Sequence, residues 1–400
     1  MAVTTNRDLV ATDDPLAVDL AVSMDSQVAN VDRDTSQFAT MLMKLPVETA
    51  KSFQEQWEED VFLPRNTALS ATAAAGDTNL AVTANEGTYA KVGDTGKFVQ
   101  TGEAFRITAV AASAWTVVRA IGSVSAATAA SGTGQGGIVI LAGSNEQGGT
   151  LPTAIVTQKT SNLNYMQIIR NAYRFTSTAE WQTWYSGNPL TYHRRKIAIE
   201  HKRDIEDQLF FGARSYTAGT NAPRCTFGGL DEYISTNITD VGGTLDKGAW
   251  NDFLRSGLEY GERNRKVLFA SPIVAQVLSE FLQDNWVRTE SAHETTVWGV
   301  SVDAVISAVH GARIPVIVKN DWKRFGEGTA KQLGSRAYLV DMTNVALKKA
   351  PATSQGPRFA ALYPKRQAND ADETAEEYLS EVTLVCKAEK THAILRGVTG

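Results

Sequence analysis

The chain has 400 residues, enough for two or three domains, and its 43% hydrophobic and 21% charged residues are typical of a globular protein. A formal net charge of -5 argues against a protein that coats nucleic acid through a broadly basic surface, although a locally basic face is compatible with it. With two distant cysteines, no signal-peptide pattern and no apolar run near the roughly 20 residues of a membrane span, we expect no disulfide framework, metal, cofactor or membrane contact.

Residues 1–64 are predicted to form an acidic N-terminal arm and a short helix. The first 60 residues carry 12 Asp and Glu against 4 Lys and Arg. No convincing apolar period precedes Lys44, which is typical of an extended arm. A helix is predicted over residues 51–62, because three apolar residues recur there at four-residue spacing: Phe53, Trp57 and Val61.

Residues 65–150 are predicted to form a small inserted all-β domain. Ala, Gly, Thr and Ser dominate this stretch, and Phe105 and Ile107 alternate with polar residues, which is the period of a half-buried strand. Turn residues separate five predicted strands: Leu80–Val82, Lys97–Val99, Ala104–Val110, Trp115–Arg119 and Ile138–Leu141.

Residues 151–225 contain the longest predicted helix. Asn188 is a good N-cap and Pro189 suits the first helical position, so the helix is expected to start there. Its pattern continues to about Phe211, and Gly212 is a plausible stop. A helix of about 22 residues would be roughly 33 Å long.

Residues 226–312 have the pattern of an α/β region, and residues 313–400 that of a strand-rich region. Helices are predicted to start at Asp246 and at Ser271-Pro272, on either side of a buried strand over Val267–Ala270. The later predicted strands are Thr296–Val309, Ile314–Lys319, Ala337–Val340, Val345–Lys348 and Tyr378–Lys387, the last extended after a bend by Ala393–Leu395.

The order of these parts resembles the Hong Kong 97-type fold of tailed-bacteriophage major capsid proteins over nearly the whole chain. The resemblance lies in order and spacing rather than in any single motif. It is carried by the segments Asn164–Trp181, Asn188–Gly212, Phe227–Thr236, Arg265–Phe281, Arg313–Asp321 and Arg336–Ala350.

This resemblance implies an α+β fold: an N-terminal arm, an extended loop, a spine helix with a peripheral β-sheet, and an axial α/β domain. Residues 65–150 would be an extra β domain in the extended loop, 226–312 the axial domain and 313–400 the peripheral strands. It also implies a non-enzymatic shell protein that forms hexamers and pentamers around double-stranded DNA. Portal, scaffold and decoration proteins would be its partners, and it would assemble in the host cytoplasm and reside in the virion.

The long helix carries a basic face that is a candidate contact surface. Residues 151–230 contain 10 Lys and Arg against 5 Asp and Glu. Such a face could meet packaged DNA or the acidic arm of a neighbour, or it could simply be solvated. Its members are Arg194, Arg195, Lys196, Lys202 and Arg203.

Aromatic residues form a second candidate surface, because aromatic side chains are favoured anchors at protein interfaces. A plain core role is an equally valid interpretation of each. The candidates are Phe53, Trp57, Trp181, Trp184 and Tyr185.

Two other hypotheses stay open at this point. The β domain would also suit a phage decoration or fibre protein, although fibres are usually repetitive β structures without a long helix. A hydrolase with an accessory β domain is the third hypothesis, but the sequence shows neither a GxSxG nor an HExxH motif.

Overall fold

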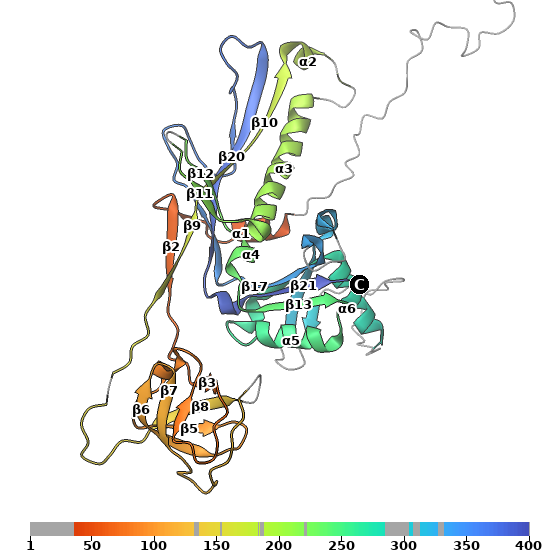
Figure 1. Ribbon diagram of the computed structural model, residues 1–400. Coiled ribbons are helices and arrows are strands. Elements are labelled where there is room, and N and C mark those ends of the chain that lie inside the picture. The colour runs from red at the N-terminus through yellow and green to blue at the C-terminus, as the bar shows by residue number, and fades with distance from the viewer. Residues whose placement is uncertain are drawn as a thin grey trace, which may run out of the picture. The chain divides into compact units, whose positions relative to one another are not determined.

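The computed structural model describes residues 36–131, 136–152, 154–182, 184, 188–219, 222–284, 304–306, 313–326 and 332–399. The chain divides into two compact units (Figure 1). One unit, here called the barrel unit, is Glu58–Ser161. The other, here called the main unit, comprises Met1–Trp57 and Asn162–Gly400.

The barrel unit contains a six-stranded sheet in the order β3-β8-β5-β6-β7-β4. All neighbouring strands are antiparallel, and an isolated bridge between Leu69 and Val82 links the two ends of the sheet into a closed barrel. The strands are β3 (Asn66–Ala68), β4 (Asn79–Ala81), β5 (Asp94–Phe98), β6 (Ala104–Ala111), β7 (Ala114–Val118) and β8 (Gly137–Gly143).

The barrel core follows from the alternating sequence pattern. Phe105 and Ile107 of β6 are buried, whereas the intervening Arg106 is exposed. Gly96 on β5 lies opposite Phe105, and a Cβ atom there would come within 2.4 Å of the ring. The predicted strands of this region are therefore present, and the expected segment 65–150 lies inside the compact unit.

The main unit contains a five-stranded sheet that carries the long helix α3 (Pro189–Phe211). Its path is β1-β18-β20-β10, and β19 also pairs with β20. β10 and β20 are paired without interruption over ten residues of β10. The strands are β1 (Glu48–Thr49), β10 (Gln167–Thr176), β18 (Val345–Lys349), β19 (Ala361–Tyr363) and β20 (Glu373–Cys386).

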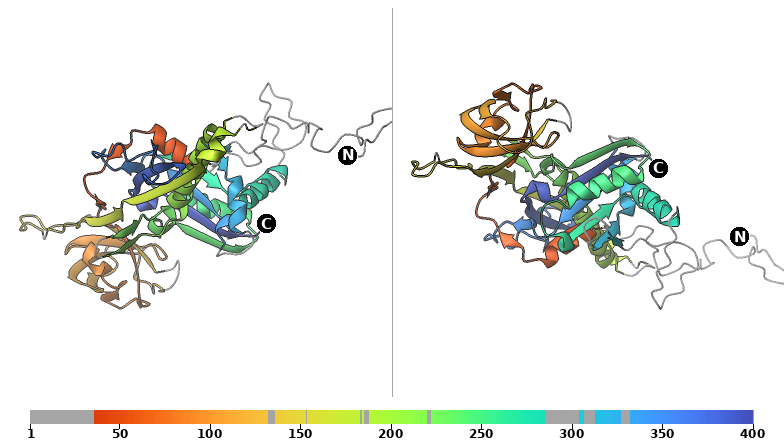
Figure 2. Two further views of the ribbon diagram at one scale, coloured as in Figure 1. Left: turned by 90° about the horizontal axis from the view of Figure 1, so that it is seen from above. Right: turned by 90° about the horizontal axis from the view of Figure 1, so that it is seen from below.

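A six-stranded sheet of the main unit is covered on both faces. Its order is β13-β21-β17-β14-β16-β15. One face packs on α5 (Lys247–Gly257) and α6 (Pro272–Asp284), as the view from below shows in Figure 2. The other packs on the end of α3 and on α4 (Leu230–Tyr233). The strands are β13 (Ile238–Gly243), β14 (Lys266–Ala270), β15 (Ala304–Ile306), β16 (Arg313–Val318), β17 (Ala337–Asp341) and β21 (Ala393–Val398).

The caps of α3 are those predicted from the sequence. The Asn188 side chain accepts a hydrogen bond from the Leu190 N–H at 2.9 Å, and Pro189 occupies the first turn. At the other end, Gly212 N–H donates to the Gln208 carbonyl at 3.0 Å. Gly229 passes so close to this helix end that a Cβ atom would lie 2.6 Å from the Gln208 carbonyl oxygen.

The helix predicted over residues 51–62 is wrong. Gln54–Glu59 is a strand, β2, which forms a two-stranded ribbon with β9 (Thr160–Tyr165). Only Trp57 of the three spaced apolar residues is buried. The four-residue spacing was therefore coincidental, and pairing with a strand about a hundred residues later decides the conformation.

The expectation that everything before Lys44 is an extended arm is also wrong. Gln37–Lys44 forms the helix α1. It buries Phe38, Ala39 and Leu42 in a cluster that includes the end of α3. Short helices are marginal in isolation, so this one depends on tertiary contacts that its local sequence does not reveal.

Residues 313–400 do not form a single set of peripheral strands. β16, β17 and β21 belong to the six-stranded sheet with β14, and only β18, β19 and β20 join β10. β21 is not an extension of the preceding strand, because Ala388 takes a positive φ of 51° and a 3-10 turn follows at Glu389–Thr391. Of the strand predicted over Thr296–Val309, only β15 lies within the described residues.

Short helices, 3-10 turns and one small hairpin complete the described part of the chain. Between β10 and α3 lies α2 (Ser177–Trp181), and a small hairpin is formed by β11 (Ser215–Thr217) and β12 (Arg224–Thr226). The remaining 3-10 turns are Glu86–Tyr89, Arg263–Arg265, Asn320–Phe325 and Leu333–Ser335.

Candidate functional site

The first basic residue of α3 is engaged inside the main unit. Arg194 donates through Nε to Glu376 Oε2 at 2.7 Å, and its second nitrogen binds the other carboxylate oxygen. Tyr173 also donates to Glu376. Hydrogen bonds from Arg194 and Tyr173 hold the pKa of Glu376 below its usual value. Arg194 therefore links α3 to β10 and β20.

The other basic residues of α3 do not share one exposed face. Arg195 and Lys196 are exposed, and Lys196 lies 4.0 Å from Glu200 one turn later. Lys202 and Arg203 are half-buried. Consecutive helical residues point about 100° apart, so five residues at these spacings spread around the helix. Of the five candidate basic residues on α3, the exposed ones are therefore Arg195 and Lys196.

The aromatic candidates separate into core and surface residues. Trp57 is buried and packs on Tyr233 with ring centroids 5.3 Å apart. Phe53 is half-exposed and stacks on Tyr165, which in turn stacks on Tyr216.

The candidates near α2 are on the surface. Trp181 at the end of α2 is 74% exposed. Trp184 is also exposed, and its Nε1 donates to the Ala179 carbonyl. Tyr185 lies outside the described residues.

A group of exposed apolar side chains was missed by the sequence analysis. In the barrel unit, Phe62 is fully exposed, Leu151 is 94% exposed and Val156 is 84% exposed. They lie in segments without regular secondary structure on either side of the barrel strands. The sequence gives little signal for them, because no periodicity marks these residues and Phe62 and Val156 stand next to other apolar residues.

A buried charge cluster was also missed. Glu206 on α3 accepts hydrogen bonds from the Phe38 and Ala39 N–H groups, which are otherwise unsatisfied at the start of α1. Lys319 Nζ lies 2.6 Å from Glu206 Oε1 and 3.0 Å from Gln37 Oε1. Burial raises the pKa of Glu206, although Lys319 and the two N–H groups favour its charged form. The sequence did contain a signal for this buried charge, because Glu206 lies within one helical turn of the apolar Ile205 and Leu209.

A Ser-His-Asn arrangement joins α3 to β10 and β20. Ser380 Oγ lies 2.7 Å from His201 Nε2, and His201 Nδ1 lies 2.6 Å from Asn171 Oδ1. Burial lowers the pKa of His201, which favours the neutral ring. Ser380 and His201 are both buried, so the arrangement offers no surface to a substrate and serves packing.

Neither a metal site nor a membrane span is evident in the described part of the chain. No group of three or more His, Cys, Asp or Glu side chains is arranged to hold a metal ion among the described residues. Within the same residues, no helix combines the length and apolar character needed to cross a bilayer.

Comparison with known proteins identifies the family. The model of the SU10 major capsid protein family matches residues 3–399. The chain belongs to this family. A curated relative, the major capsid protein of Pseudomonas phage PaMx41, is 25% identical over 197 residues. That match spans 45% of this chain and only 45% of the relative's length.

Solved structures confirm the predicted fold class. The cyanophage A-1(L) capsid is similar with a TM-score of 0.52 at 13% identity, covering 98% of this chain and 99% of that one. The capsid of the native GTA particle has a TM-score of 0.50 at 8% identity, covering 96% and 97%. The fold is the Hong Kong 97-type α+β capsid fold, and neither the decoration or fibre hypothesis nor the hydrolase hypothesis is favoured.

Proposed function

We propose that this capsid-family chain is the shell-forming subunit of a tailed-bacteriophage head. Copies would associate into hexamers and pentamers of an icosahedral shell around the double-stranded DNA genome. The observation that carries the proposal is the family match over almost the whole chain. The chain would assemble in the host cytoplasm, reside in the virion and have no catalytic role or cofactor.

The exposed apolar side chains of the barrel unit support self-association. Phe62, Leu151 and Val156 would stay in water in an isolated subunit. Removing apolar surface from water contributes about 25 cal/mol per Å². In a closed shell the same contact recurs in every copy, so a modest gain at each interface stabilises the whole particle.

We assign the segments of the chain to parts of a capsid subunit. Residues 1–64 would form the arm, now including α1, and residues 65–150 a β domain inserted in the extended loop. Residues 151–225 would supply the loop return and the spine helix α3. The axial domain would comprise 226–312 together with β16, β17 and β21, because these strands share its sheet.

Two surface groups are proposed as contacts outside the subunit. Arg195 and Lys196 would face DNA or the acidic arm of a neighbour, without reading base sequence, because a container must accept any genome. Trp181 and Trp184 would act as interface anchors. Portal, scaffold and decoration proteins are the further partners that a head subunit of this family would have.

The test is assembly of the purified protein, followed by sedimentation and electron microscopy. Shells, tubes or hexamers are expected. The double variant Phe62→Ser, Leu151→Ser should need a higher protein concentration to assemble, whereas Val118→Ser, exposed on β7 of the barrel, is the matched control. Wild-type protein that stays monomeric under every assembly condition contradicts the proposal.

A further inference from the structure

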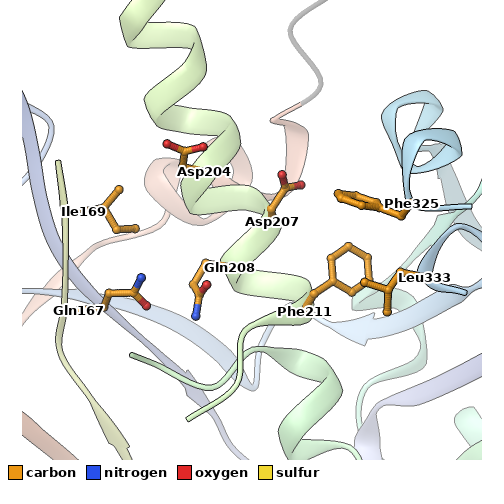
Figure 3. A pocket seen from close by; sticks show the side chains of 8 residues that line it. All are labelled: Gln167, Ile169, Asp204, Asp207, Gln208, Phe211, Phe325 and Leu333. Atoms are coloured by element: carbon orange, nitrogen blue, oxygen red, sulfur yellow. The ribbon is translucent and has the colours of Figure 1, made fainter. Parts of the chain in front are cut away.

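A pocket of about 460 Å³ lies beside the second half of α3 in the main unit (Figure 3). Two carboxylates and one apolar side chain from α3 line it, together with three apolar side chains from three other elements. The acidic residues are Asp204 and Asp207, and the apolar ones are Ile169, Phe211, Phe325 and Leu333. The pocket therefore combines apolar walls with a negatively charged rim.

The carboxylate of Asp207 is only half satisfied. Its Oδ2 accepts a hydrogen bond from Arg324, while its buried Oδ1 has no hydrogen-bond partner among the residues that the structure describes. Burial raises the pKa of Asp207 to about 6, and the nearby Asp321 and Asp204 add to that shift. Arg324 and Lys319 act in the opposite direction without cancelling it. The isolated subunit thus keeps a carboxylate in surroundings that disfavour its charge.

The remaining polar groups of the pocket are occupied by the subunit itself. Gln208 Nε2 donates to the Phe227 carbonyl at 2.8 Å, and Gln167 Oε1 accepts from the Phe227 N–H at 3.1 Å. Asp204 Oδ2 accepts from Asn171 Nδ2 at 2.7 Å and is exposed. The attraction left for an incoming group comes from the two carboxylates, and it favours a cation.

We propose that this pocket receives a lysine or arginine side chain from a second copy of this chain. The aliphatic stem would lie along Ile169, Phe211 and Phe325, and the charged head would bind the exposed carboxylate of Asp204 and compensate the nearby negative charge of Asp207. Long basic side chains bury their stems on apolar surface while the charge meets a polar rim. Such a contact would fix the register between neighbouring copies. The inference rests on the proposed function, since it names a contact of the same assembly.

The chemistry of the pocket distinguishes this occupant from others. A calcium ion would need about six to eight oxygen ligands, more than two carboxylates on apolar walls provide. Exposed basic side chains of the required kind are present on this chain. A second copy therefore satisfies both the apolar and the charged parts of the pocket.

The test compares the double variant Asp204→Asn, Asp207→Asn with wild type in full-length protein. Both amides keep the shape of the side chains and remove their charge. The protein concentration needed for assembly should rise about tenfold. The melting temperature of the unassembled subunit should not fall, because burial already disfavours the Asp207 charge. The matched control, Asp252→Asn with Glu262→Gln, removes two exposed carboxylates away from the pocket and should assemble as wild type does.

Three outcomes would overturn the inference. The double variant could assemble at the wild-type concentration. It could instead assemble poorly and also melt lower, which indicates a role inside the subunit. A chelator could reduce wild-type assembly to the level of the double variant while leaving the variant unchanged, which indicates a metal ion. Failure of the wild-type protein to assemble at all would instead contradict the proposed function. Failure of the pocket inference and failure of the proposed function are therefore distinguishable.

Discussion

The barrel unit and the main unit each bury an ion pair, and the two pairs differ in how well their charges are compensated. In the barrel unit, Arg119 binds both oxygens of Glu103 at 2.6 Å, and the Ala120 and Ala127 N–H groups also donate to that carboxylate. Burial alone would raise the pKa of Glu103, but these donors hold it below its usual value. Arg119 additionally donates to three backbone carbonyls.

The pair in the main unit is compensated less completely. Glu206 meets a lysine and two backbone N–H groups, and the net effect of burial is a raised pKa. A planar guanidinium offers two parallel hydrogen bonds to a carboxylate, whereas an ammonium acts as a point charge. The barrel pair also joins residues 16 apart, whereas Glu206 lies 113 residues from Lys319 and 168 from Phe38. The buried ion pair of the barrel unit therefore joins nearby segments of the chain, whereas that of the main unit joins distant ones.

The largest expected effect is that of Arg119→Met. It would leave a buried carboxylate without its cation, which costs about 3–5 kcal/mol of barrel stability. Hydrogen exchange of β5–β7 amides measures the loss. Replacing the whole pair, Glu103→Leu with Arg119→Met, should recover part of it, and Arg106→Met on the exposed face of β6 is the control. Unchanged exchange in Arg119→Met would mean that the guanidinium does not hold the barrel closed.

Next in size is Glu206→Gln in the main unit. The amide oxygen can still accept from an α1 N–H group, but the buried Lys319 ammonium loses this carboxylate, for a cost of about 3 kcal/mol. The loss should concentrate in α1, so the Phe38, Ala39 and Leu42 amides should exchange faster than those of α3. Continued protection of α1 would contradict the assignment of Glu206 as the group that holds this helix.

The contrast between local and distant contacts also explains which elements could be predicted from the sequence. In the barrel, alternation such as that of Phe105 and Ile107 and nearby turn residues specify strands, and β5, β6 and β7 pair with their neighbours in the chain. The start of α3 was equally local, because Asn188 and Pro189 supply its cap within three residues. These elements were predictable because the groups that satisfy them are adjacent in the chain.

Most of the wrong predictions depended on distant partners. β2 has the spacing of a helix, yet its backbone pairs with β9 about a hundred residues later. α1 is capped by Glu206, and β16 and β17 join β14 rather than the strand that follows them. One candidate contact residue shows the same dependence: Arg194 resembles a surface cation in the sequence, but the fold brings Glu376 beside it.

A smaller effect, of opposite sign, is expected for Asp207→Asn in the unassembled subunit. The folded-state pKa of Asp207 is about 6, above its ordinary 3.8, so the folded state holds a proton more tightly than the unfolded state. The wild type therefore loses stability as pH rises from about 4 through 6. The variant lacks this loss and should be more stable by about 1–2 kcal/mol at pH 7.5, with the gap closing near pH 4. Urea unfolding at several pH values measures it, and a pH-independent gap would show that the carboxyl is not the cause.

The smallest effects are expected for exposed ion pairs. They test whether the strength of an ion pair depends on its burial or on which of the two units contains it. Lys196 and Glu200 form an exposed pair on α3 of the main unit, and Lys159 and Glu58 form one in the barrel unit. Exposed pairs are screened by solvent and lose side-chain entropy, so Lys196→Met should cost at most about 0.5 kcal/mol. Lys159→Met should leave the unfolding midpoint of the barrel unchanged. If both surface pairs contribute little to stability while both buried pairs contribute much, exclusion of solvent accounts for the difference. A large loss of stability in either surface variant would instead require an unrecognised contact at that site.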